Sequence, residues 1–587
     1  MTEPEHSSGA VSRSGRALLA LAALAVAFAA ADTYVVVLSL PDMMSSVGLS
    51  VEQLQRAAPI VSGFLLGYVA VLPLIGRIAD LRGRLPVLIA SLLVFAFGSM
   101  VTAAAYDLAS LVAGRFLQGV GGGGLVPVTL ALVADLYPAH RRGVPLGVVG
   151  AVQELGSVLG PLFGAVVLTF GTWRDIFWIN LAVGLILAVA IRAVGRRDRV
   201  SDDRTRVTDP VGLTLLALWL AGLLVVMRQP SALITSVRWG APFVPFRPGG
   251  SIWLSPIGLA VIALGVALLA WLLHARHPWV DLRSWWRSVR QADLLGALLL
   301  AVALGGVILA FATADPEVQV LAPAGPWFLA LAALGAVLFW IHQRRATVAL
   351  VPRGALAQRP AWGALVVSFF VGSALIAALV DIPVFARLTV HGESQLGAAL
   401  VLVEFLVALP IGALAGGYLV RWFPSAVVAA AGLALAAVGF VLMANWGVDA
   451  LLHPTASATL AVTGLGFGLA LAPVNAALLA STADEVHGVT SALLVVARMV
   501  GMLVGISALT TLGLRRYYAV SADVPPAAQV CGAGVTRCDA YTDLLRGAGI
   551  AQLHAIFLGA AVCAAAAAVL GLVLLRGAAT GARSDSV

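Results

Sequence analysis

Residues Leu18–Pro41 read LLALAALAVAFAAADTYVVVLSLP and contain one charged side chain, Asp32. At about 1.5 Å per residue, a helix of this length crosses the ~30 Å hydrocarbon core of a bilayer. A carboxylate in such a segment costs roughly 2.5 to 3.5 kcal/mol on insertion scales. We therefore expect this stretch to be the first membrane-spanning helix and Asp32 to have a function inside the membrane.

The composition of the whole chain agrees with this interpretation. Of its 587 residues, 61% are hydrophobic and only 11% are charged, which excludes an ordinary soluble protein and indicates a multi-pass membrane protein. The formal charge of +8 comes from arginine alone, because the chain has no lysine. These arginines lie in short loops between apolar runs, so we interpret them as membrane-orientation signals and not as a nucleic-acid site.

Apolar runs recur along the chain and predict an all-α protein with about sixteen membrane-spanning helices. We expect them near 17–40, 57–78, 85–105, 110–134, 143–168, 173–194, 210–228, 252–274, 292–314, 326–342, 362–388, 395–420, 426–446, 457–482, 488–513 and 551–576.

These runs divide the chain into five parts. We predict a cytoplasmic tail (1–16), a six-helix bundle (17–194), a linker (195–361), a second six-helix bundle with an outer loop at 515–550 (362–576), and a second cytoplasmic tail (577–587).

The linker sequence resembles one helical hairpin that occurs twice. Asp209–Gly212 (DPVG) and Asp293–Gly296 (DLLG) each open a helix, and IALGVALLAW at Ile262–Trp271 is similar to LAALGAVLFW at Leu331–Trp340. We infer a duplicated two-helix insertion.

The arginine-rich loops alternate with loops that carry more acidic residues, and this pattern predicts that both termini are cytoplasmic. The loop with Cys531 and Cys538 is then extracytoplasmic, where the two thiols can form a disulfide.

Six ionisable residues are each the only charge of their predicted span. They are Asp32, Arg115, Glu154, Asp381, Glu404 and Arg498. Such residues usually face a bundle interior or a wet cavity, although structural pairing between helices is the alternative. Counting from the helix ends places Glu154 and Arg498 near mid-bilayer, where they can meet across a central cavity, with Asp32 further out. The pattern gives no catalytic, metal or cofactor site.

Three motifs resemble the major facilitator superfamily. Gly76-Arg77-Ile-Ala-Asp80-Leu-Arg-Gly83-Arg84 is similar to its G-x-x-x-D-x-x-G-R loop between helices two and three. Arg115–Gly121 (RFLQGVG) is similar to its helix-four motif. Gly156, Gly160, Pro161 and Gly164 (GSVLGPLFG) match the helix-five signature of its proton-driven antiporters, in which Ala165 replaces the usual final glycine.

Further strings resemble its fourteen-helix drug:proton antiporter branch and, within it, mycobacterial triacylglyceride exporters that work with a lipoprotein. They are Asp32–Val37 (DTYVVV), Gln153–Pro161 (QELGSVLGP), Trp173–Asn180 (WRDIFWIN) and Val496–Met499 (VARM). The resemblance implies two six-helix bundles and proton-driven lipid export from the cell membrane.

The same resemblance implies roles for individual residues. Asp32, Glu154 and Arg498 would couple protons, and Gly76, Arg77, Asp80, Gly83 and Arg84 would form a cytoplasmic gate. As lone charges of their spans, Arg115, Glu404 and Asp381 are expected to supply cavity charge. The linker departs from the pattern of this branch. The branch carries two linker helices, whereas this chain has four apolar runs there.

Two other functions stay open at this point. A multidrug exporter of amphipathic compounds would share every motif, and a non-transporting scaffold or sensor would need no intact proton site. We do not expect an ATP-driven pump, because the sequence shows no G-x-x-x-x-G-K-[ST] loop or soluble domain to hold nucleotide. We expect a monomer whose partners are lipid or amphipathic substrate, protons and an extracytoplasmic lipoprotein, with no enzyme activity, cofactor or nucleic acid.

Overall fold

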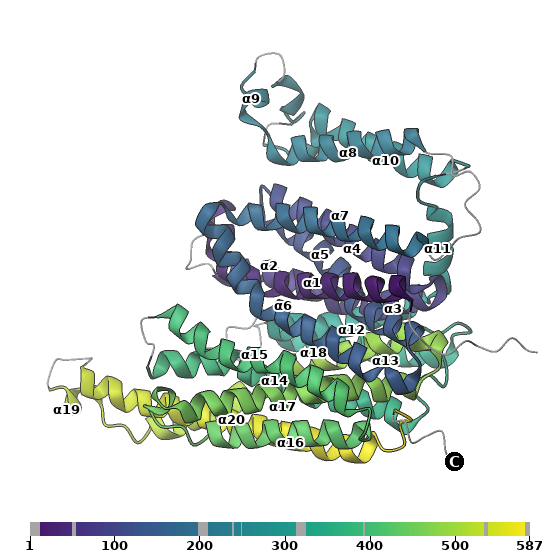
Figure 1. The fold of residues 1–587 in the computed structure, drawn as a ribbon. Coiled ribbons are helices and arrows are strands. Elements are labelled where there is room, and N and C mark those ends of the chain that lie inside the picture. Colours follow the sequence, from purple (N-terminus) through teal and green to yellow (C-terminus); the bar gives the residue numbers. More distant parts are fainter. Residues whose placement is uncertain are drawn as a thin grey trace, which may run out of the picture.

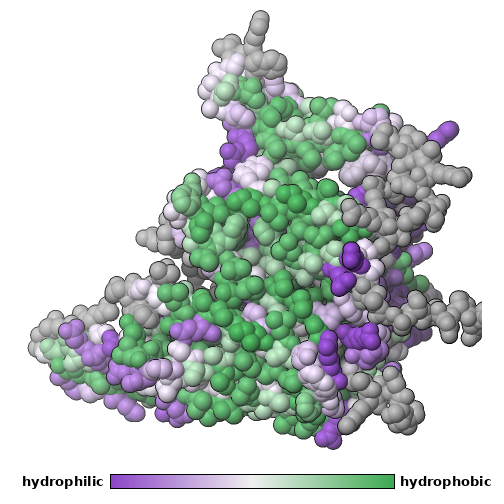
Figure 2. Space-filling view, in the orientation of Figure 1, coloured by the Kyte–Doolittle hydropathy of each residue, from purple (hydrophilic) through white to green (hydrophobic). Residues whose placement is uncertain are grey.

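The computed structural model describes residues 12–49, 54–197, 209–236, 240–247, 249–276, 278–312, 324–390, 394–532 and 538–580. Within these ranges all regular structure is helical, and sixteen helical segments are long and apolar enough to span a membrane. This confirms the predicted fold class and number of spans. Hydrophobic side chains cover the middle of the face in Figure 2, and hydrophilic ones gather toward the helix ends, as a membrane protein requires.

The first bundle is built from residues 13–197. Its helices are α1 (Arg13–Ser46), α2 (Leu54–Ala70), α3 (Leu72–Arg82), α4 (Arg84–Ala104), α5 (Leu108–Leu136), α6 (Gly143–Phe170) and α7 (Trp173–Arg197). The second predicted span is broken at Val71, because Pro73 follows it and favours the first turn of a new helix. Therefore α2 and α3 together form one span.

The second bundle follows the linker. Its helices are α14 (Arg359–Leu388), α15 (Gln395–Leu419), α16 (Ser425–Met443), α17 (Pro454–Ala480), α18 (His487–Ser521) and α20 (Asp539–Leu574). It has its own apolar core, in which Phe385, Phe440 and Phe557 are fully buried and the ring of Phe557 contacts the other two. Figure 1 shows the two bundles as adjacent layers, with the purple and blue helices above the green and yellow ones.

The linker contributes two hairpins and one short helix between them. Its helices are α8 (Pro210–Arg228), α9 (Ser231–Ile234), α10 (Pro256–His274), α11 (Leu282–Gln291), α12 (Leu294–Ala312) and α13 (Gly325–Arg345). The α8–α10 hairpin packs on α4, on the side of the first bundle that faces away from the second (Figure 1). The α12–α13 hairpin instead contacts α2 and α18, so α12 touches both bundles.

The two hairpins are anchored in the same way, as the repeated sequence suggests. Asp209 caps the first helix of one hairpin and accepts hydrogen bonds from Trp271 Nε1 (3.0 Å) and the backbone N–H of Trp279 (3.2 Å). Asp293 likewise accepts from the backbone N–H of Gly296 (3.0 Å) at the start of α12 and of Leu350 (2.9 Å), and it pairs with His342 Nε2 (2.8 Å). Each aspartate thus ties the start of its hairpin to the chain that follows it.

Helices α18 and α20 are much longer than a membrane span. They have 35 and 36 residues, which at 1.5 Å per residue gives about 50 Å each. Figure 1 shows their connected ends, with α19 (Ala527–Val530), extending beyond the other helices. A disulfide joins Cys531 to Cys538 in this extension.

Glycines let the helices of the first bundle approach closely. A Cβ atom at Gly119 of α5 would lie 2.1 Å from the carbonyl oxygen of Phe64 in α2, and one at Gly123 would lie 2.5 Å from that of Tyr68. Small residues at such crossings bring backbones together, as is common in membrane proteins.

We predict that Gly119→Ala destabilises the protein although alanine favours helices. The added methyl group meets backbone atoms that cannot rotate away, and overpacking typically costs about 1–3 kcal/mol. The matched control is Gly547→Ala, also inside a helix, where a Cβ atom would meet nothing within 4 Å. Thermal unfolding of both variants in detergent checks this, and equal midpoints would contradict the prediction.

Candidate functional site: a buried ion pair, a central cavity and a gate

Asp32 lies in α1 and is fully buried inside the first bundle. Its Oδ2 atom is 2.8 Å from Arg115 Nη1 of α5, and its Oδ1 atom accepts a hydrogen bond from Asn180 Nδ2 of α7. From the sequence we expect Arg115 to supply cavity charge, and in the structure it pairs with Asp32 inside the first bundle. Both oxygens of the carboxylate therefore have a partner from another helix.

Arg115 is held by a second set of contacts. It donates to Gln118 Oε1 (2.9 Å), whose Nε2 donates to Ser99 Oγ (2.8 Å) of α4. Its guanidinium also lies over the ring of Phe64, 4.4 Å from the centroid. Buried charges require such pairing because both lose their hydration.

The helix-five glycines pack against α1 on both sides of Asp32. A Cβ atom at Gly156 would lie 2.2 Å from the carbonyl oxygen of Ala27, and one at Gly160 would lie 2.4 Å from that of Ala31. A Cβ atom at Gly164 would instead lie 2.6 Å from the side-chain Cγ2 atom of Val35. The motif thus allows α6 to lie directly on the helix that carries Asp32.

Glu154 and Arg498 line one cavity between the two bundles. It has a volume of about 40 Å³, enough for a few water molecules but not for a lipid. Glu154 is buried and comes from α6, whereas Arg498 comes from α18. The charge of Arg498 acts on Glu154 across the cavity, but the two side chains form no direct ion pair in the part of the chain that the structure describes.

The rest of the cavity wall is mostly apolar. Its other lining residues are Val126, Leu130, Val149, Gly150, Gln153, Ser368, Val371, Ala470, Leu471, Val474, Asn475, Leu494 and Val495. The polar residues Gln153 and Asn475 were not singled out from the sequence, because an isolated amide in an apolar helix gives no pattern. They place hydrogen-bonding groups beside Glu154 and Arg498.

The other predicted membrane charges do not line this cavity. Asp32 is sealed in the first bundle with Arg115. Asp381 is partly buried in α14, and Glu404 is exposed on α15 beside exposed Leu400 and Val407. The structure therefore brings Glu154 and Arg498 together and leaves Asp32, Asp381 and Glu404 apart from them.

The Gly76–Arg84 loop joins the two bundles at one end of the molecule. Asp80 accepts hydrogen bonds from the backbone N–H groups of Gly488 (2.7 Å) and Val489 (2.9 Å), at the N-terminus of α18, and pairs with Arg84. A carboxylate is favoured there because a helix N-terminus carries partial positive charge. Gly76 allows this contact, since a Cβ atom would lie 2.4 Å from the carbonyl oxygen of Gly488.

Gly83 has a backbone conformation that suits glycine, with φ of 93° at the junction between α3 and α4. It turns the chain so that Arg84 reaches across to the second bundle. Arg84 Nη2 donates to the carbonyl oxygen of Asp484 (3.1 Å), and its Nε lies 3.3 Å from Asp135 Oδ2. Arg77 is part of α3, and no specific role for it follows from these contacts.

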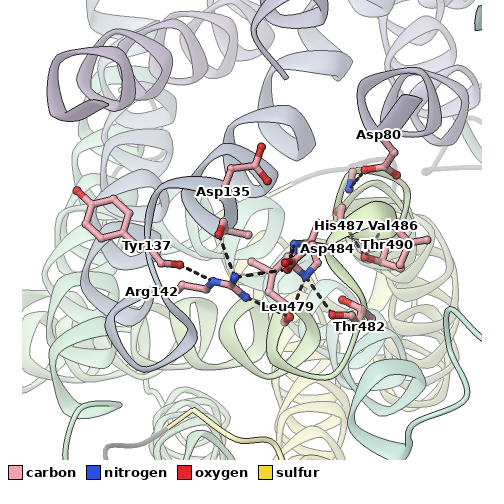
Figure 3. A network of polar contacts seen from close by, with 12 residues as sticks. Asp80, Asp135, Tyr137, Arg142, Leu479, Thr482, Asp484, Val486, His487 and Thr490 are labelled. Carbon is pink, nitrogen blue, oxygen red and sulfur yellow. Dashed lines mark hydrogen bonds and ion pairs between the residues drawn. The ribbon is translucent and has the colours of Figure 1, made fainter. Parts of the chain in front are cut away.

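A second network at the same end was not predicted. Figure 3 shows Arg142 between the bundles, where it donates to the carbonyl oxygens of Ala134 (2.9 Å) and Leu479 (3.3 Å) and lies 3.7 Å from Asp484 Oδ1. His487 is buried beside it, 3.5 Å from the same carboxylate. Burial lowers the pKa of Arg142, and the nearby carboxylates oppose that shift.

The gate is completed by direct backbone contact between α6 and α15. A Cβ atom at Gly143 would lie 2.6 Å from the carbonyl oxygen of Gly417, and one at Gly147 would lie 2.6 Å from that of Ala413. We call these contacts, together with Asp80, Arg84 and Arg142 and their partners, the gate. The bundles are closed at this end.

In the described ranges, no group of three His, Cys, Asp or Glu side chains is arranged to hold a metal ion. The site consists of charges, amides and close helix contacts. Such an arrangement can bind and release protons and can change with the relative position of the bundles.

Comparison with known proteins gives consistent matches. A triacylglyceride transporter of Mycolicibacterium smegmatis is 36% identical over 568 residues, covering 94% of this chain and 86% of its own. One of Mycobacterium tuberculosis is 34% identical over 582 residues, covering 96% and 95%. One of Mycolicibacterium hassiacum is 37% identical over 505 residues, covering 84% and 78%.

Among solved structures, the human organic anion transporter MFSD10 has a TM-score of 0.51 at 15% identity, covering 95% of this chain and 99% of its own. The proton:xylose symporter XylE also has a TM-score of 0.51 at 15% identity, covering 95% of each chain. At this identity the two structures support the fold alone. The family model of the Major Facilitator Superfamily matches residues 22–506. The chain therefore belongs to the major facilitator superfamily and is a multi-pass transporter related to mycobacterial triacylglyceride transporters.

Proposed function

We propose that this protein is a proton-coupled secondary exporter that moves triacylglyceride-like lipid out of the inner leaflet by alternating access. The observation that carries the proposal is the cavity between the bundles, in which Glu154 and Arg498 face each other without a direct ion pair. The names of its relatives support the lipid substrate.

Proton coupling requires a carboxylate that can exchange an arginine partner for a proton as the protein changes state. Glu154 and Arg498 come from different bundles, so their separation depends on how the bundles are oriented. When the two side chains approach, the arginine favours the carboxylate. When they separate in an apolar cavity, protonation neutralises Glu154.

Asp32 has a different place in this mechanism. It stays paired with Arg115 and Asn180 inside one bundle, beside the α1–α6 contact. Protonation of Asp32 would release Arg115 and loosen the packing around α6, which also carries Glu154. Proton binding would thus involve both carboxylates.

The apolar lining suits acyl chains, which gain little by leaving the membrane, while Gln153 and Asn475 can donate to ester oxygens. In the present state the gate is closed and the cavity is small. Transport requires a second state in which the gate opens and admits lipid. The lipid then enters from the side of the membrane on which the gate lies. We infer from the arginine-rich loops that this is the cytoplasmic side and that both termini lie there.

The first prediction from this proposal concerns Asp32. We expect Asp32→Asn to abolish transport of labelled triacylglyceride in proteoliposomes while the protein still folds, because asparagine keeps the shape but cannot carry the charge that holds Arg115. Asp42→Asn, in the same helix but exposed, is the control. Wild-type transport by Asp32→Asn would remove Asp32 from the mechanism. Export of cationic dyes but not of triacylglyceride by the wild type would instead favour a multidrug exporter.

The second prediction concerns Glu154. Transport by the wild type should accelerate when a proton gradient is imposed, and Glu154→Gln should lose this dependence because glutamine cannot titrate. Exposed Glu485 supplies the control, Glu485→Gln, which should keep it. The measurement is the ratio of transport rates with and without the gradient. An unchanged ratio for Glu154→Gln would show that protons are coupled elsewhere.

The third prediction concerns the gate. Asp80→Asn should shift the protein toward the state open at this end, because it removes the charge that binds Arg84 and the N-terminus of α18. A loss of about 1.4 kcal/mol would shift the equilibrium tenfold. Spin labels are attached at positions 140 and 423, which are both exposed at this end, in a Cys563→Ser background. The distance between the two labels reports whether the gate is open. Asp543→Asn, in the first turns of α20 and far from the gate, is the control. An unchanged distance distribution in Asp80→Asn would contradict this role.

A further inference from the structure

A pocket lined by arginines lies where α10 ends and α11 begins. It has a volume of about 390 Å³, well above the roughly 10–15 Å³ that a cavity needs to hold one water molecule. Its lining residues are Leu272, Ala275, Arg276, Pro278, Asp281, Arg283 and Arg287. We call it the α10–α11 pocket, and nothing in the transport mechanism above uses it.

The three arginines outnumber the single carboxylate in this pocket. Asp281 already accepts a hydrogen bond from the backbone N–H of Ser284 (3.1 Å) at the start of α11. In the described part of the chain, Arg276, Arg283 and Arg287 form no ion pair within 4.0 Å. Convergent guanidinium groups without carboxylate partners favour a phosphate, which accepts paired N–H donors.

The surroundings of the pocket indicate that this phosphate belongs to a lipid. Leu272 comes from the last turn of a membrane-spanning helix, so the pocket lies at the level of the membrane surface. Trp279 and Trp286 are 37% and 56% exposed next to it, and tryptophan is typical of that interface. Amphipathic helices with arginines beside exposed aromatic residues bind anionic lipid surfaces.

A neighbouring face of α11 contacts the gate loop. Arg82 Nη1 donates to Ser284 Oγ (2.5 Å) and Ser288 Oγ (3.4 Å), and its guanidinium lies 4.3 Å from the ring centroid of Trp285. Arg82 is two residues beyond Asp80, which binds the N-terminus of α18. Asp281 attracts the guanidinium of Arg82 more strongly than Arg287 repels it.

We propose that the α10–α11 pocket binds the phosphate of an anionic phospholipid head group and that the bound lipid stabilises the closed gate. The phosphate bridges Arg276, just after α10, to Arg283 and Arg287 of α11. It thereby holds α11 in the position in which Ser284, Ser288 and Trp285 contact Arg82. This inference does not depend on which substrate the protein transports.

The test uses the full-length protein and native mass spectrometry with phosphatidylglycerol or phosphatidylcholine. We expect preferential binding of phosphatidylglycerol and at least a tenfold loss of it in Arg283→Gln/Arg287→Gln. The control Arg13→Gln/Arg290→Gln removes the same charge from two exposed positions outside the pocket and should bind as the wild type does. Equal loss in both double variants, or equal binding of the two lipids, would overturn the proposal.

A second arm separates the lipid from free phosphate and tests the effect on the gate. Inorganic phosphate alone should not reproduce the effect of phosphatidylglycerol, because it lacks the acyl chains that keep a head group at the membrane surface. In nanodiscs, phosphatidylglycerol should move the label distance between positions 140 and 423 toward the closed state in the wild type but not in Arg283→Gln/Arg287→Gln. An equal effect of inorganic phosphate, or an equal shift in that variant, would overturn the assignment.

Discussion

A charge inside a membrane protein must find a partner, and this constraint explains how the buried residues of this chain are arranged. Asp32 and Arg115 form an ion pair within one bundle, Asn180 donates to the second oxygen of Asp32, and Gln118 accepts a hydrogen bond from Arg115 Nη1. The distance between Glu154 and Arg498 depends on how the two bundles are positioned relative to each other. The first pair can be broken only by a change inside a bundle, whereas the second changes whenever the bundles move. This difference allows one protein to combine a stable fold with a moving site.

Close backbone contact supplies the second constraint. Glycines at the α3–α18 and α6–α15 crossings bring the bundles together at the gate, where Asp80 reaches the N-terminus of α18. Any side chain at Gly76 or Gly143 would separate these backbones and lengthen the polar contacts around them. The gate therefore needs small residues and charged residues together, because the hydrogen bonds form only when the helices touch.

The sequence predicted the fold well because the membrane imposes a strong and regular pattern. Sixteen apolar runs became sixteen candidate spans, and most ends agreed within a few residues. The break at Val71 was not predicted, since the apolar run continues through it. Helix α11 was also missed, because ten residues with three arginines lack the apolar run that marks a span.

The site was predicted less completely, for a different reason. A lone charge in an apolar run identifies a residue but not its partner, so the contact between Asp32 and Arg115, 83 positions apart, required the structure. Arg142 and His487 lie at helix ends, where ordinary orientation signals also occur, and their part in the gate could not be separated from that background. The disulfide partners, by contrast, were restricted by having only two cysteines in one loop.

The linker combines two similar hairpins with contacts to both bundles. An even number of inserted helices leaves the second bundle in its original orientation, and the equivalent roles of Asp209 and Asp293 indicate that each hairpin is a self-anchored unit. Such a unit can be added beside a transporter without disturbing its core. Yet α12 contacts helices of both bundles, and α11 holds Arg82 of the gate loop. Because these contacts reach the elements that must move, the linker must either move with the gate or resist its opening, and the linker therefore contributes to the energy difference between the two states.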